Sequence, residues 1–456
     1  MRAILIGAAL PGRRRGAGLR GAGGALIAAA AVGLVIQRGE VISQSVGGWI
    51  VLVAALIGLA IVAGFGATRP SVLVIAAFGL SSAVRVEPAP VDLLLIVAVA
   101  FTASRVLPRV RVPPVVAIAL ALFVPLSIAS SLNAVNGARA LRFEAISIYL
   151  IVSAVWLSGV FEDTILTRRA VKAYVIAAVG SAAVAVAALY VHFPGSSIFV
   201  YSGGQRAQGL FKDPNVFGPF LVPAFAVVLE EIIRPRFLGW RVRTLVSALG
   251  ILGAGVVFAF SRGGWLNLFL ATATIFITYL ARTGGIRRAW RGALALAVPL
   301  AAGLAILIAT GQTSFLRERA HGQAYDQTRF AAQAEAFSHA SRHVLGYGAG
   351  QVDVTLPAST HSVYARLTYE QGWGGLAILV LLLGGTAAKA FSATRRDVDL
   401  HGIGSAALLG SFLGMLGNSF VVDTFHWRHL WMVMALIWAL PESRSEAADV
   451  PLDGSG

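Results

Sequence analysis

The sequence contains a histidine whose position suits acid–base chemistry. His361 lies in STHSVYARLTYEQGWGGL, residues 359–376, at the start of a long apolar run. Histidine has an ordinary pKa of about 6.5, so it can take a proton from an attacking hydroxyl near neutral pH. In the alternative interpretation His361 is a satisfied polar residue at a helix start, with Thr360 or Ser362 as the cap. The residue type alone leaves both interpretations open.

Polar residues follow His361 at helical spacings. Arg366 and Glu370 are four residues apart, the spacing at which charged side chains pair along one helix face. We therefore predict a structural ion pair between them. Ser362, Tyr364 and Glu370 are candidates for supporting contacts around His361.

Three arginines have the chemistry of an anion site. They are Arg206 in GGQRAQGLFKDPN, Arg262 in FSRGGW and Arg329 in DQTRF. Arginine offers a planar fork of donors that matches phosphate, and neighbouring glycines permit close backbone approach. The alternatives are contact with lipid headgroups for Arg206, a structural ion pair for Arg262 and a pair with Asp326, three residues earlier, for Arg329.

Two other polar segments are predicted to have structural roles. Asp213 and Asn215 precede an apolar run and are predicted to cap a helix, and Asn215 is also a candidate supporting residue. The segment DTFHWRH, residues 423–429, contains two histidines and an aspartate but is crowded with aromatic residues, so it favours anchoring at the membrane interface over metal binding.

The composition identifies the elements that must position these residues. The chain has 456 residues, of which 57% are hydrophobic and 13% charged, with no cysteine and a net charge of +16. Its mean hydropathy is +0.77. This is the composition of an integral membrane protein, and lipid favours helices because unpaired backbone groups are costly there. The arginines lie mostly in short loops between apolar runs, which indicates cytoplasmic loops beside membrane lipids rather than binding to nucleic acid.

We predict an all-α polytopic bundle of about 12–14 transmembrane helices with a small helical external loop domain. The first span is expected to be a retained signal anchor. The candidate spans are 21–36, 45–66, 70–84, 90–104, 114–132, 143–160, 169–193, 214–233, 243–260, 264–281, 289–310, 362–391, 402–421 and 427–441.

The charge distribution predicts the topology. The arginine-rich loops and both termini are expected on the cytoplasmic side, and the long connections 194–213 and 311–361 on the external side. The chain then divides into a first bundle part (1–310), the external loop (311–361) and a last bundle part with a cytoplasmic tail (362–456). Within the loop we predict a helix over the bundle, with Asp326 as N-cap and an apolar face of Phe330, Ala334 and Phe337. All the candidate site residues fall on the external side.

The order and sidedness of these motifs resemble a known family. RAQGLFKDPNVFG before a span, SRGGWL between two spans, a long external loop ending in GYGAG and then HSVYARLTYEQGWGG resemble the O-antigen ligase and O-antigen polymerase superfamily. The resemblance covers roughly residues 200–376. It implies a bacterial inner-membrane glycosyltransferase that moves a glycan from an undecaprenyl-diphosphate carrier to an acceptor hydroxyl on the periplasmic face, with inversion and without a metal or other cofactor.

The resemblance also implies roles for individual residues. Arg206 and Arg262 match the diphosphate-binding arginines, Arg329 is a candidate third, and His361 would activate the acceptor hydroxyl. Ser362 stands where the family often has asparagine. Of the external connections only 311–361 is large enough to form an element of its own, which favours a ligase acting on lipid A core or another non-repeat acceptor. A polymerase of the same superfamily is the alternative, and a polyisoprenoid-glycan flippase or transporter is the alternative from another class.

Overall fold

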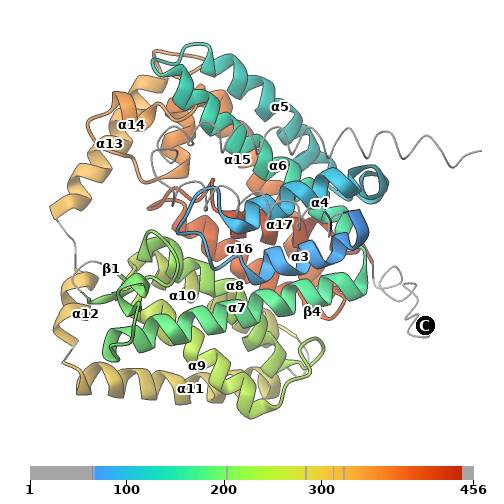
Figure 1. Ribbon diagram of the computed structural model, residues 1–456, viewed down its shortest axis with the longest axis vertical. Helices are drawn as coiled ribbons and strands as arrows, with labels where there is room; N and C mark the ends of the chain where they lie inside the picture. Colours follow the sequence, from blue (N-terminus) through green and yellow to red (C-terminus); the bar gives the residue numbers. More distant parts are fainter. Residues whose placement is uncertain are drawn as a thin grey trace, which may run out of the picture.

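The computed structural model describes residues 64, 67–201, 204–282, 285–311, 313–321 and 324–443, and these form an all-α helix bundle (Figure 1). The predicted span 21–36, nearly all of 45–66 and the tail beyond 443 lie outside the described residues. The helices and strands, in chain order, are α3 (Pro70–Gly79), α4 (Pro90–Val106), η1 (Leu107–Arg109), α5 (Pro114–Ser131), α6 (Gly137–Val160), α7 (Thr164–Tyr190), η2 (Ser196–Phe199), β1 (Val200–Tyr201), β2 (Arg206–Ala207), α8 (Pro214–Ile233), α9 (Val242–Phe258), α10 (Arg262–Leu280), α11 (Gly285–Ala309), α12 (Thr313–Ala320), α13 (Ala324–Ala340), α14 (Val352–Thr355), α15 (Val363–Arg395), β3 (Asp399–Leu400), β4 (Ile403–Gly404), α16 (Ser405–Asn418) and α17 (Arg428–Trp438).

The apolar runs of the sequence coincide with these helices. Each predicted span from 70–84 onward overlaps one helix, which confirms the predicted all-α polytopic bundle. Among the described residues, seven helices are long and apolar enough to cross a membrane: α4, α5, α6, α7, α8, α10 and α15. These helices fit a membrane protein, because each has the length that a bilayer core of about 30 Å requires.

Two helices form the centre of the bundle. Nearly every residue of α8 is buried, and α16 packs against α8, α10, α15 and α17 (Figure 1). Gly410 and Gly414 of α16 face Ala271 and Asn267 of α10 so closely that an added Cβ would overlap them. The G-x-x-x-G pattern therefore brings the two helix backbones together, as small residues do in membrane bundles.

Several long helices connect two ends of the bundle. The helices α8, α10 and α15 begin near His361 and end near Glu230 and Asp397. We call these the His361 end and the Glu230 end. Figure 1 shows α13 and α14 beside the start of α15, the end of α5 and the start of α6, whereas α9 and α11 lie together along another edge.

Helix α15 is divided near the His361 end. Gly372 has φ 67°, a conformation that glycine adopts at low cost, and an added Cβ would overlap the carbonyl of Val344. The part from Trp373 to Arg395 is about 34 Å long at 1.5 Å per residue, enough to cross a bilayer core. The part from Val363 to Gln371 is a separate short helix that carries Arg366 and Glu370.

The helix predicted in the 311–361 segment exists, but two details of the prediction are wrong. It begins at Ala324, so Asp326 lies in the first turn rather than at the N-cap. Its buried residues are Ala332, Ala336 and Ala340, whereas Phe330 is 59% exposed and Ala334 is exposed. Alanine occupies the contact because α13 packs closely on α15, and larger side chains would hold the two helices apart.

Candidate functional site

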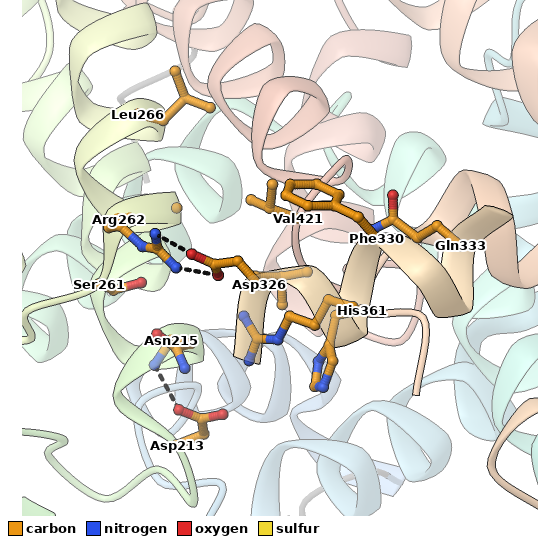
Figure 2. Close-up of a pocket in the computed structure, with 13 residues that line it drawn as sticks. Asp213, Asn215, Ser261, Arg262, Leu266, Asp326, Phe330, Gln333, His361 and Val421 are labelled. Atoms are coloured by element: carbon orange, nitrogen blue, oxygen red, sulfur yellow. Dashed lines mark hydrogen bonds and ion pairs between the residues drawn. The ribbon is translucent and has the colours of Figure 1, made fainter. Parts of the chain in front are cut away.

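Five segments that are far apart in the sequence line one cavity at the His361 end. The cavity has a volume of about 330 Å³ (Figure 2). It is lined by the start of α8, the beginning of α10, the first turns of α13, His361 just before α15, and the segment that follows α16. Its lining residues are Asp213, Asn215, Ser261, Arg262, Gly263, Leu266, Asp326, Arg329, Phe330, Gln333, His361, Val421 and Val422.

Side-chain hydrogen bonds fix the start of α8, which forms one side of the cavity. Asp213 is the N-cap of α8 and accepts a hydrogen bond from the Asn215 N–H at 2.8 Å, as predicted. Arg206, on β2, donates to the Ala259 carbonyl at 2.9 Å and to Asn215 Oδ1 at 3.1 Å, and its guanidinium lies 5.6 Å from the centre of the Tyr201 ring. Arg206 therefore orients Asn215, which lines the cavity, while Arg206 itself is not among the described lining residues.

Arg262 enters the cavity from the first residue of α10. Ser261 caps this helix by accepting from the Gly264 N–H at 3.2 Å. Gly263 lies so close to the Asn418 side chain that a Cβ would overlap it, so the glycine lets α10 begin against α16. A helix N-terminus carries a partial positive charge, which adds to the charge of Arg262 at this wall of the cavity.

Helix α13 supplies the opposite wall. Asp326, Arg329, Phe330 and Gln333 recur at the spacing of one helix face, and all line the cavity. Asp326 forms a bidentate ion pair with Arg262, at 2.5 Å and 2.7 Å (Figure 2). The sequence prediction does not include Gln333 and gives Asp326 only as a cap or a partner of Arg329, although the helical spacing of the four residues indicates one face.

His361 lies between the short helix α14 and the start of α15. Its φ of 46° is in the left-handed region, which is strained for a residue with a Cβ. Its neighbours fix it on both sides, because the Thr360 carbonyl accepts from Gln333 Nε2 at 3.0 Å and the Ser362 hydroxyl caps α15 by accepting from the Ala365 N–H at 3.5 Å. Backbone strain of this kind is common at functional sites.

The surroundings of His361 favour its neutral form. Burial lowers its pKa below the ordinary value, and the positive charge of Arg329 lowers that pKa further. The carboxylates of Asp213, Asp353 and Asp423 oppose this shift but do not reverse it. A neutral imidazole near pH 7 can accept a proton, so the site keeps its only lining histidine, among the described residues, in the state that a general base needs.

The other two predicted supporting residues lie away from the cavity. The Tyr364 hydroxyl donates to the Leu416 carbonyl at 3.2 Å, which ties α15 to α16. Glu370 is buried and accepts from Arg366 Nε at 3.0 Å, so the predicted structural pair is confirmed. Arg366 also pairs with Asp423 at 2.6 Å and Asp353 at 3.1 Å, two partners that the sequence analysis missed.

A second, smaller cavity of about 210 Å³ lies beside the first. No described residue lines both cavities, but pairs of neighbours in the sequence do: Lys212 lines the second and Asp213 the first, and Asp423 lines the second and Val422 the first. The second cavity also contains His426, Trp427 and Arg428.

The residues of the DTFHWRH segment pack into the bundle: Thr424, Phe425, Trp427 and His429 are buried, and the other three are half-buried. Burial lowers the pKa of His426 to about 4, and Trp427 is 8% exposed. Arg428 forms a bidentate pair with Asp92, at 2.5 Å and 2.6 Å. Anchoring of this segment at the membrane interface stays a prediction. Across the described residues, no group of three or more His, Asp or Glu side chains is arranged to hold a metal ion.

No protein-family model matches the chain, and a search of curated proteins finds no match either.

Proposed function

We propose that this protein transfers a glycan from an undecaprenyl-diphosphate carrier to an acceptor hydroxyl at the His361 end of the bundle. The observation that carries the proposal is the cavity of about 330 Å³ in which Arg262, Arg329 and His361 meet although they come from three distant segments. Two arginines and a helix N-terminus suit a diphosphate, and a neutral histidine suits removal of a proton.

The reaction is a single displacement at the anomeric carbon of the glycan. The acceptor oxygen forms a bond to that carbon while the bond between the carbon and the diphosphate oxygen breaks. His361 takes the hydroxyl proton, and the electron pair leaves with undecaprenyl diphosphate, whose charge Arg262 and Arg329 stabilise. Attack opposite the leaving group inverts the anomeric centre, and positioning with electrostatic stabilisation supplies the rate enhancement.

The second cavity supports a reaction with two substrates. Its walls combine the aromatic rings of Trp427 and Phe220 with the charged groups of Lys212 and Asp423, a mixture that suits a sugar with its hydroxyls. Because it adjoins the first cavity, an acceptor glycan bound there lies beside the carrier-linked donor. A carrier-lipid transporter needs no such second sugar site.

The proposal includes a location and an orientation. The protein lies in a bacterial inner membrane, the His361 end faces the periplasm or exterior, and both termini are cytoplasmic, as the arginine-rich loops indicate. The acceptor is lipid A core or another non-repeat acceptor, which makes the enzyme a ligase. A polymerase that joins repeat units differs only in its acceptor.

The test is a transfer assay with purified protein in proteoliposomes, an undecaprenyl-diphosphate-linked glycan and candidate acceptors, resolved on a gel. The native chain should give a single shifted acceptor band, and His361→Ala should lower the transfer rate by about 100-fold or more. His192→Ala is the matched control, because His192 is exposed and does not line the cavity, and it should retain the native rate.

Three other outcomes are informative. A ladder of repeat units would identify a polymerase. A native rate in folded His361→Ala would rule out His361 as the base. Movement of the carrier-linked glycan between leaflets, with no transfer to any acceptor, would favour a transporter.

A further inference from the structure

Asp326 occupies the donors that an anion in the cavity would use. Its two carboxylate oxygens accept from the two terminal nitrogens of Arg262, at 2.5 Å and 2.7 Å, and both side chains line the cavity. Figure 2 shows Asp326 reaching from α13 toward Arg262 on α10. The pair is partly solvated, since the side chains of Arg262 and Asp326 are 32% and 18% exposed.

A carboxylate and a phosphate bind the same face of a guanidinium. Both accept two parallel N–H bonds from the arginine fork, so Asp326 is chemically a stand-in for one phosphate of a diphosphate. Asp326 occupies the end-on face of Arg262, formed by the two terminal nitrogens. A diphosphate that binds this same face in bidentate fashion must therefore compete with Asp326.

The pair also holds the beginning of α13. Among the described side chains of this helix, the buried ones are Ala332, Ala336 and Ala340, all in later turns that pack on α15. Gln333 bonds to the Thr360 carbonyl, again beyond the first turn. The first two turns, in contrast, have exposed residues such as Thr328 and Phe330. The Arg262–Asp326 pair is thus a contact that ties these turns to α10.

We propose that Asp326 is a displaceable counter-ion: the diphosphate of the donor replaces it on Arg262, and this releases the first turns of α13 from α10 as the donor binds. The inference rests on the proposed function, because it takes the ligand to be a diphosphate. The apparent affinity for diphosphate is then the affinity of the open form multiplied by the fraction of molecules in which the Arg262–Asp326 pair is open.

The test measures the affinity for inorganic diphosphate at low ionic strength, with purified protein in detergent. Asp326→Asn removes the competing charge and should tighten binding by about 5-fold. Glu335→Gln is the matched control, because Glu335 lies on the same helix but does not line the cavity, so its affinity should equal that of the native chain. Equal or weaker binding by Asp326→Asn would mean that Asp326 only positions Arg262, and would overturn the inference.

A second measurement keeps Asp326 in place and so does not depend on the folding of that variant. The chain has no cysteine, so Ser197→Cys and Thr328→Cys, both at exposed positions, allow two spin labels to be attached without background. Saturating inorganic diphosphate should shift or broaden the distance distribution between the labels. Binding of diphosphate with an unchanged distribution would contradict displacement of α13.

The two proposals fail in different ways. If neither the native chain nor Asp326→Asn binds inorganic diphosphate, the anion site itself is absent, and both the proposed function and the displacement are contradicted. If both bind with the same affinity, only the displacement by the donor is contradicted and the anion site stands.

Discussion

The two ends of the bundle both gather arginines and carboxylates, but they differ in what the charges face. At the Glu230 end, Asp397 accepts from Arg234 at 2.5 Å and 2.7 Å and pairs with Arg282 at 2.9 Å. Glu231 accepts backbone N–H bonds from all four residues 236–239. The cavity there has a volume of about 10 Å³. At the His361 end, Arg262, Arg329 and His361 face a cavity of about 330 Å³.

This difference separates charges that the protein encloses from charges that face a cavity. Charged groups that satisfy one another in a closed space stabilise the connection between segments and leave nothing for a ligand. Charged groups that line an open cavity, even when paired as Arg262 is with Asp326, are in contact with the space that a ligand would occupy. The contrast can be tested by making the same kind of change at both ends.

The largest expected effect is on turnover at the His361 end. Arg262→Gln should lower kcat/KM for glycan transfer by about 100-fold to 1,000-fold, because in the proposed reaction it removes a donor that stabilises the leaving diphosphate. Arg234→Gln makes the same change at the Glu230 end, and Asp397 keeps Arg282 as a partner. The kcat/KM of Arg234→Gln should stay within about 3-fold of the native value, measured in the same assay. Similar losses in both variants would contradict the distinction between the ends.

The next largest effect is a loss of stability, and we expect it at the Glu230 end rather than at the His361 end. Glu231→Ala leaves the backbone N–H groups of residues 236–239 without their carboxylate acceptor. We expect it to lower the free energy of unfolding by about 3 kcal/mol, measured by denaturation in detergent. The activity of the remaining folded molecules should be native. A loss of activity at unchanged stability would show that the Glu230 end takes part in the reaction.

A smaller loss of stability is expected from Gly404→Ala. A Cβ at this position would overlap the Glu230 carboxylate, which cannot move freely because it accepts from the Tyr279 hydroxyl at 2.8 Å and from the Ala407 N–H at 2.5 Å. Overpacking of this kind costs about 2 kcal/mol. Gly384→Ala is the control, since no atom lies within 4 Å of its added Cβ. Equal stability of the two variants would indicate that the Glu230 end can relax around a methyl group.

The sequence predicts the helices well because length and apolarity are local properties. Every predicted span within the described residues corresponds to a helix, and the Arg366–Glu370 pair lies on one helix as its spacing indicates. Partners across the bundle are not local. Nothing in the spacing of residues tells that Asp326 pairs with Arg262, 64 positions away, or that Asp353 and Asp423 converge on Arg366.

The site shows the same limit. The motif order predicts that His361, Arg262 and Arg329 share one side of a membrane, and the structure brings them to one cavity. The sequence does not separate Arg206 from them, because its position outside the cavity lining, in contact with Asn215, depends on its bond to the distant Ala259 carbonyl. The predicted apolar face of α13 is right for Phe337, which stacks on Trp373 of α15, and wrong for Phe330 and Ala334, which are exposed while Ala332 and Ala336 are buried. Hydrophobicity favours Phe330 over Ala332, whereas close packing on α15 selects the smaller side chain.

The smallest expected effect is a shift in the pH dependence of transfer. His361 must be neutral to accept a proton, so kcat/KM should fall on the acidic side as His361 becomes protonated. Since burial and Arg329 lower its pKa, the midpoint of this acidic limb should lie below the ordinary histidine value of about 6.5. Arg329→Gln removes the positive neighbour, so the pKa of His361 should rise and the limb should move to higher pH.

The control for this shift is Arg342→Gln. It removes the same charge from an exposed position beyond the end of α13, and it should leave the limb in place. Because Arg329→Gln also weakens donor binding, the informative quantity is the midpoint of the limb rather than the rate at any one pH. A limb that stays in place in Arg329→Gln would mean that the titrating group is not His361. A limb that moves equally in both variants would mean that the charge of the whole α13 segment, and not the cavity, sets the pKa.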